Sequence, residues 1–227
     1  MKPDVLFVNG GWDGHEPFAT ASRFAALVEL EGLSTLQADS TRVLADLDAA
    51  DAPRLIVPNW TMGSLSEAEE RGLLAAVRGG AGLAGWHGGM GDAFRANPAY
   101  QFAVGGQWVE HPGGIVDFDV QVTGVDHPIT RGLSGFHVRS EQYYLHVDPG
   151  NLVLATTRVS HPEYPWVEGT VMPVAWTRHY GAGRVAYCSL GHVNEDFDEP
   201  NTRELVLRGL LWAARADAAL AGRVATP

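Results

Sequence analysis

Short apolar runs alternate with helical patterns in the first half of the chain. Four apolar runs have the length of buried strands: residues 4–9, 33–38, 54–58 and 81–86. A helical pattern begins at Pro17 and is stopped by Gly32. Ser66 and Glu69 have the spacing of a capping box, which predicts a second helix that extends to about Arg78. This alternation predicts a parallel sheet with helices on both faces.

The second half of the chain is dominated by strand patterns. Its predicted elements are strands at residues 115–122, 139–147 and 151–156, a β-hairpin of residues 171–177 and 184–190, and a helix from residue 200 to about residue 219. The chain shows no linker, repeat or low-complexity segment, so we expect a single domain over residues 1–227. An irregular segment that contributes to a site is expected around residues 88–115.

Composition narrows the class of protein. The chain carries 27 acidic residues and 16 lysines and arginines, a formal net charge of −11. This charge argues against nucleic-acid binding and against an anionic membrane surface. No apolar run is long enough to span a membrane and no secretory signal is visible, so a cytoplasmic protein is expected. Cys188 is the single cysteine, which excludes an intrachain disulfide.

Aromatic and histidine side chains follow three of the predicted strands. In parallel α/β sheets, ligands bind beyond the carboxyl ends of the strands. The residues at this predicted edge are Trp12, His15, Asn59, Trp60, Trp86 and His87. A tryptophan after a strand is commonly ordinary packing. Several at one edge indicate a surface that stacks on a hydroxyl-rich ring, so a small-molecule sugar is the expected ligand.

Gly85-Trp86-His87-Gly88-Gly89 is the sharpest local motif. A G-x-X-x-G turn after a strand is typical of a nucleophile elbow, and here His87 occupies the raised position. A histidine there can be a general acid or base, or a metal ligand. The alternative is a glycine-rich turn with a packed histidine.

Three further side chains are candidates. His111 lies in the irregular segment, and His192 follows Gly191 after the last predicted strand. His192 points to the same edge if its strand is parallel to the others. Glu141 is a carboxylate in an aromatic strand, and its burial would require a partner such as a histidine. Each residue taken alone is compatible with a structural role.

Six motifs occur in order along nearly the whole chain. They are residues 85–89 (GWHGG), 105–108 (GGQW) with His111-Pro112, 126–129 (DHPI) with Gly132-Leu133, 141–144 (EQYY), 173–176 (PVAW) with 181–185 (GAGRV), and Gly191-His192. This set resembles the ThuA-like (trehalose utilisation) family. The resemblance implies a class I glutamine amidotransferase-like fold, that is, a flavodoxin-like parallel sheet flanked by helices, here with an added β-hairpin.

The amidotransferase chemistry is not expected to be shared. In those enzymes the elbow carries a cysteine, whereas here it carries His87 and Cys188 lies inside a hairpin strand. A thiolate-dependent glutaminase is therefore not expected. The resemblance implies a role in sugar catabolism, in company with sugar dehydrogenases that make 3-keto sugars.

Two hypotheses follow. The first is an enzyme, a lyase, isomerase or hydrolase, that acts on a disaccharide or keto-sugar derivative. His87, His192 and Glu141 would be its acid–base groups, and Trp12, His15, Asn59, Trp60, Trp86 and His111 would bind the substrate. No cofactor is required, although the histidines and a carboxylate would also suffice for zinc. The second is a non-catalytic sugar-binding or regulatory module. A homo-oligomer is compatible with either hypothesis.

Overall fold

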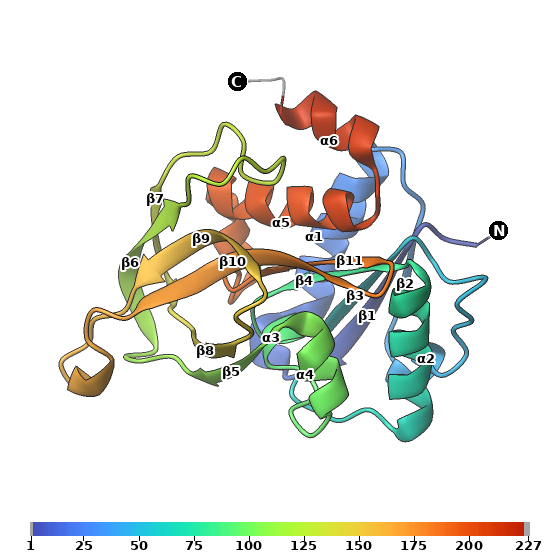
Figure 1. The fold of residues 1–227 in the computed structure, drawn as a ribbon, viewed down its shortest axis with the longest axis horizontal. Coiled ribbons are helices and arrows are strands. Elements are labelled where there is room, and N and C mark those ends of the chain that lie inside the picture. The colour runs from blue at the N-terminus through green and yellow to red at the C-terminus, as the bar shows by residue number, and fades with distance from the viewer. Residues whose placement is uncertain (1, 225–227) are drawn as a thin grey trace.

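The computed structural model describes residues 2–224 and shows a nine-stranded mixed sheet covered by helices on both faces (Figure 1). The parallel half contains β2 (Thr35–Ala38), β1 (Val5–Gly11), β3 (Leu55–Thr61), β4 (Gly82–Trp86) and β11 (Gly183–Cys188), in that order. The antiparallel half continues with β10 (Val171–Tyr180), β9 (Leu152–Arg158), β6 (Ile115–Val122) and β7 (Phe136–Glu141). The predicted fold class, an α/β sheet flanked by helices, is confirmed.

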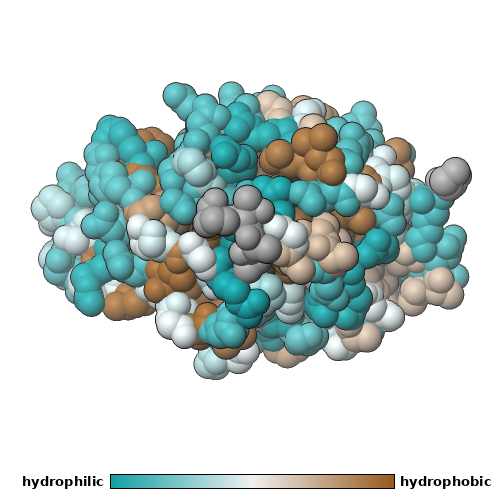
Figure 2. All heavy atoms as spheres, turned by 90° about the horizontal axis from the view of Figure 1, so that it is seen from above, coloured by the Kyte–Doolittle hydropathy of each residue, from teal (hydrophilic) through white to brown (hydrophobic). Residues whose placement is uncertain are grey.

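Two hydrophobic cores lie on the two faces of this sheet. One contains α1 (Pro17–Leu30), α5 (Pro200–Ala213) and α6 (Asp217–Val224), and the other contains α2 (Glu67–Gly79), α3 (His87–Gly91) and α4 (Pro98–Val104) (Figure 1). Apolar positions at helical spacing explain the packing: Ala21, Phe24 and Val28 of α1 are fully buried. Seen from the side of α5 and α6, the surface is mostly hydrophilic, with its hydrophobic side chains in separate groups (Figure 2). None of the helices in residues 2–224 is long and apolar enough to cross a membrane.

The strand predicted at 139–147 is two strands in two sheets. The chain leaves the main sheet after Glu141, and β8 (Tyr144–Val147) pairs instead with β5 (Gly106–Glu110). At the break, Gln142 donates hydrogen bonds to Thr157 Oγ1 at 2.7 Å and to the Arg158 carbonyl at 3.2 Å. β5, α3 and α4 were not predicted; they fill the segment expected to be irregular.

The structure changes the predicted end of the last helix and confirms the predicted β-hairpin. The last helix was predicted to about residue 219, but Arg215 takes a left-handed φ of 55° and separates α5 from α6. The predicted hairpin is confirmed, and its turn tightens to two residues because Tyr180 pairs with Gly183. Gly181 has a φ of 62°, which glycine adopts without strain.

The capping box predicted for α2 is formed. Ser66 Oγ accepts from the Glu69 amide, and Glu69 Oε2 accepts from the Ser66 amide at 2.7 Å. The Thr41 hydroxyl donates a further hydrogen bond to Glu69 Oε1 at 2.8 Å. The hydrogen bonds from Ser66 hold the pKa of the Glu69 carboxyl below its usual range.

We expect Glu69→Ala to lower the free energy of unfolding by about 1 kcal/mol at pH 7, the usual effect of losing a helix cap. Because the folded-state pKa of Glu69 is depressed, its contribution is present above the unfolded-state pKa and is lost as the pH falls through the folded-state value. The difference from wild type should therefore narrow below about pH 4. Urea unfolding at several pH values measures this. Glu67→Ala, an exposed neighbour in the same helical turn, is the control, and an equal loss in both variants would contradict the assignment.

Candidate functional site

The carboxyl ends of four parallel strands meet at one edge of the sheet. The chain passes from β1 into a 3-10 turn, η1 (Asp13–His15), from β3 it continues beyond Thr61, and from β4 it passes directly into α3 at His87. β11 is parallel to β4, and His192 follows it by four residues. His15, His87 and His192 therefore reach the same edge from three different connections.

Four side chains form a compact group at this edge, here called the histidine–glutamate cluster: His15, His87, Glu141 and His192. One nitrogen or oxygen atom from each lies within 4.8 Å of those of the others. Glu141 Oε2 lies 3.1 Å from His87 Nε2, 3.4 Å from His192 Nδ1 and 3.9 Å from His15 Nε2. His15, His87 and Glu141 are buried, so these groups are largely removed from water.

Hydrogen bonds from outside the cluster orient two of the imidazole rings. His15 Nδ1 lies 2.7 Å from Thr61 Oγ1, and His87 Nδ1 lies 2.8 Å from the Ser189 carbonyl oxygen. In both rings Nε2 is therefore the atom turned toward Glu141. His192 Nδ1 is buried and has no hydrogen-bond partner among the described residues.

Burial and mutual charge set the ionisation of the cluster. Burial, together with the charges of His87 and His192, lowers the pKa of His15 to about 2. Burial also lowers the pKa of His87, although Glu141 opposes this effect. For Glu141, burial raises the pKa, but the neighbouring His192 and His87 outweigh it and the pKa lies below its usual range. These shifts favour neutral His15 and His87 beside an ionised Glu141.

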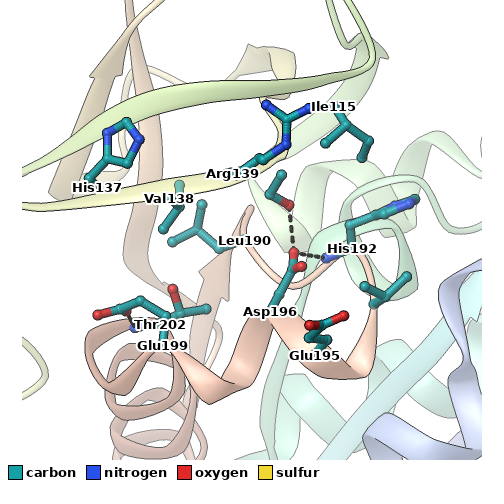
Figure 3. Close-up of a pocket in the computed structure, with 12 residues that line it drawn as sticks. Ile115, His137, Val138, Arg139, Leu190, His192, Glu195, Asp196, Glu199 and Thr202 are labelled. Carbon is teal, nitrogen blue, oxygen red and sulfur yellow. Dashed lines mark hydrogen bonds between the residues drawn. The ribbon is translucent and has the colours of Figure 1, made fainter.

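The pKa of His192 moves in the opposite direction. Burial lowers it, but the carboxylates of Glu141, Asp196 and Glu16 outweigh burial, so the pKa is raised. Asp196 is also held in place, since its Oδ2 accepts from the His192 amide at 2.9 Å and from Ser140 Oγ at 2.5 Å (Figure 3). His192 is thus the histidine of the cluster best able to carry a proton near neutral pH.

Aromatic rings and a fourth histidine, His111, border the cluster. Tyr143 stacks on His87 with ring centroids 4.0 Å apart, and the half-exposed Trp12 packs edge-on against His15 at 4.7 Å. His111 Nε2 lies 3.8 Å from Glu141 Oε1, and the ring lies 5.6 Å from Trp108. This border leaves part of Trp12 and His111 accessible to a ligand.

Backbone strain concentrates at the elbow. His87 has a φ of 44°, in the left-handed region that non-glycine residues seldom adopt. A Cβ on Gly88 would lie 2.4 Å from His15 Cε1, and one on Gly89 would lie 2.6 Å from Asn59 Oδ1. The glycines of the predicted elbow are therefore required by close approach, and the strain lies where the sequence motif places His87.

Trp86 does not line the cluster, and the expectation for it is wrong. Its side chain is only 2% exposed and packs with Phe24 and Phe197 in the core on the α1 and α5 face. Successive side chains of a strand point to opposite faces, so the last residue of β4 contributes to the core.

Asn59 and Trp60 lie outside the histidine–glutamate cluster and make structural contacts instead. Asn59 Nδ2 donates to the Pro17 carbonyl at 2.6 Å and to Thr20 Oγ1 at 3.2 Å, which fixes the start of α1. The ring of Trp60 covers Gly10 and Gly63 and packs against the core on the α2 face. Thr61, Tyr143 and Ser189, which do contact the histidines, were missed. Thr61 follows the strand predicted at residues 54–58 and is the last residue of β3, so its position at this strand end was a signal that could have identified it.

A cavity of about 600 Å³ opens beside His192 (Figure 3). Its walls combine the apolar side chains of Ile115 and Val193 with the charged side chains of Arg139, Glu195 and Asp196. This volume is ordinary for a small-molecule site. The cavity adjoins the cluster through His192, and the hydrogen-bonded pair of Ser140 and Asp196 also lines it.

Comparisons with known proteins give one family match and several solved structures with a similar fold. A family model described as ThuA, trehalose utilisation, matches residues 4–213. A ThuA-like protein from Parabacteroides merdae ATCC 43184 has a TM-score of 0.73 at 19% identity, over 95% of this chain and 91% of that one. A ThuA-like protein from Bacteroides uniformis ATCC 8492 has a TM-score of 0.72 at 17% identity, over 94% and 92%.

A β-galactosidase shares the fold over part of its length. The enzyme from Rahnella sp. R3 has a TM-score of 0.61 at 14% identity, over 97% of this chain and 32% of that one. A comparison with curated proteins found no match. At these identities the structural likenesses show a common fold.

We expect Cys188→Ala to retain the fold with a loss of about 1 kcal/mol, because the thiol packs as a small apolar group. Cys188 is buried in β11, and burial raises the pKa of its thiol to about 12. The native protein should therefore react with a thiol reagent such as DTNB only after unfolding in guanidinium. Rapid labelling of the native protein would show an accessible thiolate and contradict this assignment.

Proposed function

Because the chain belongs to the ThuA (trehalose utilisation) family, we propose that it is an enzyme of sugar catabolism whose active centre is the histidine–glutamate cluster. One observation carries this proposal. Three imidazoles from separate connections meet around one oxygen of the Glu141 carboxylate, three of these four side chains are buried, and the strained His87 is among them. Burying such groups is unfavourable, and active sites are where perturbed titratable groups gather.

The proposed substrate is a disaccharide or its keto derivative. The half-exposed ring of Trp12 beside His15 offers an apolar face for a sugar ring, and the cavity next to His192 has both charged and apolar walls. A ketone acidifies the neighbouring C–H bond, so a keto sugar is open to isomerisation or elimination by positioned proton donors and acceptors.

The proposed chemistry uses imidazole and carboxylate groups and no thiol. Cys188 is buried and protonated, so it cannot serve as a nucleophile. The cluster can act through its own protons or as a ligand set for a divalent metal, and His87 and Glu141 are needed in both cases. His111, partly exposed and 3.8 Å from Glu141 Oε1, is placed to exchange a proton with the substrate.

Glu141→Gln and His87→Gln should each lower turnover by at least about 100-fold, because both remove a titratable group from the reacting centre. The assay incubates the purified chain with glycosides and their 3-keto forms and detects products by mass spectrometry. His146→Gln is the matched control, since His146 is an exposed histidine of β8 outside the cluster, and its turnover should equal that of wild type.

A non-catalytic sugar-binding module would give a different result. No product would form with wild type, and both variants would keep sugar affinity within about tenfold, the effect of one hydrogen bond. That result would overturn the proposed enzyme. Circular dichroism and thermal unfolding of each variant separate a lost function from a lost fold.

A further inference from the structure

The contacts of His87 leave two hydrogen-bond acceptors facing each other. The Ser189 carbonyl can only accept, so His87 Nδ1 must carry the proton of that 2.8 Å contact. In a neutral ring, Nε2 then presents its lone pair, and it lies 3.1 Å from the Glu141 Oε2 atom. Two acceptors at this distance repel each other unless a cation lies between them.

We propose that His15, His87, Glu141 and His192 bind a divalent transition-metal ion of the Zn²⁺ type. The proposal deepens the proposed function, because it names what the same cluster holds. The alternative cation is a second proton on His87, which would place an imidazolium on a side chain that is only 1% exposed.

The spacing of the four ligand atoms fits one ion. Ligand atoms 2.0–2.1 Å from a tetrahedral Zn²⁺ lie about 3.4 Å from one another. The three contacts of Glu141 Oε2 with the imidazole nitrogens are 3.1, 3.4 and 3.9 Å. The widest spacing in the group is 4.8 Å, so the rings need to close by about 1 Å toward a common centre.

The surroundings of the cluster also match those of metal sites. Histidine ligands usually donate a hydrogen bond through the N–H of their second nitrogen, which fixes the ring. His15 does so with Thr61 Oγ1 and His87 with the Ser189 carbonyl. His192 Nδ1 is buried without a hydrogen-bond partner among residues 2–224, which is expected of a nitrogen that awaits a ligand.

The donor set indicates the class of ion. Imidazoles suit Zn²⁺, Fe²⁺ and related ions, whereas Mg²⁺ and Ca²⁺ take mainly oxygen ligands. Three imidazoles and one carboxylate therefore favour a first-row transition metal. When bound, such an ion polarises a carbonyl oxygen. His111 stays outside the ligand set.

Equilibrium dialysis of the chelator-stripped full chain against Zn²⁺, followed by elemental analysis, tests the proposal. Wild type should bind one Zn²⁺ per chain, and Glu141→Gln should bind it at least about 100-fold more weakly, since even outer partners of metal ligands contribute 10- to 100-fold. His137→Gln is the matched control. His137 lies 3.0 Å from Asp119 and 3.4 Å from Asp117 in an exposed group that could hold metal adventitiously.

Thr61→Val separates a metal site from a hydrogen-bonded network. It removes the partner of His15 Nδ1 and no ligand, so Zn²⁺ affinity should fall by about 10- to 100-fold. Thermal unfolding of each stripped variant checks the fold, and His192→Gln serves as the second ligand variant if Glu141→Gln does not fold.

Binding of Zn²⁺ that is lost in His137→Gln but kept in Glu141→Gln would overturn the proposal, as would a wild type that binds none. These measurements use no sugar, so they are independent of the proposed activity. A wild type that binds no Zn²⁺ but turns over a sugar in the separate assay would overturn the metal site and leave the enzyme, whereas one bound Zn²⁺ without turnover on any sugar would do the reverse.

Discussion

The burial of the Glu141 carboxylate is the constraint on which the rest of the site depends. An ionised carboxylate away from water must be compensated by charge or hydrogen bonds. Three imidazoles surround Glu141 Oε2 within 3.9 Å, and two of them are fixed by outer contacts. Removing any one of these four side chains would leave the others without a partner that offsets the cost of their burial.

The two halves of the sheet contribute different residues to the site. The parallel half places His15, His87 and His192 at the carboxyl ends of its strands, and the antiparallel half brings Glu141 from β7. Three strands separate β7 from β11, so in a flat sheet Glu141 of β7 would lie about 19 Å from β11. The sheet must therefore curl, and the register shifts of β10 against β9 between Pro173 and Trp176 are irregularities that increase twist.

The elbow of this fold combines strain with an unusual side chain. His87 occupies a left-handed position at the end of β4, and Glu16 and Met62 take similar conformations after β1 and β3. Such conformations cost on the order of 1–3 kcal/mol each and persist only where the surroundings determine them. Three of the five non-glycine residues with a positive φ in residues 2–224 therefore lie at the edge that carries the cluster.

Local patterns in the sequence determined the scaffold. The capping box of α2, the hairpin of β10 and β11, the strand–helix alternation and the elbow glycines each depend on neighbouring residues, so a single sequence was enough to predict them. Ligands bind beyond the carboxyl ends of parallel strands, and this rule predicted that His15, His87 and His192 lie at one edge of the sheet.

Only the tertiary structure decided how these residues meet. The contact of Glu141 with His87 joins positions 54 residues apart and depends on the curl of the sheet and on the break at Gln142. The prediction that Trp86 lines the site failed because neighbouring residues of a strand point to opposite faces of the sheet, and the side chain of Trp86 points into the core. Thr61 and Ser189 act on ring nitrogens through contacts that exist only after strands distant in sequence have paired. Non-local pairing and side-chain direction, which no short pattern encodes, therefore decided the chemistry of the site.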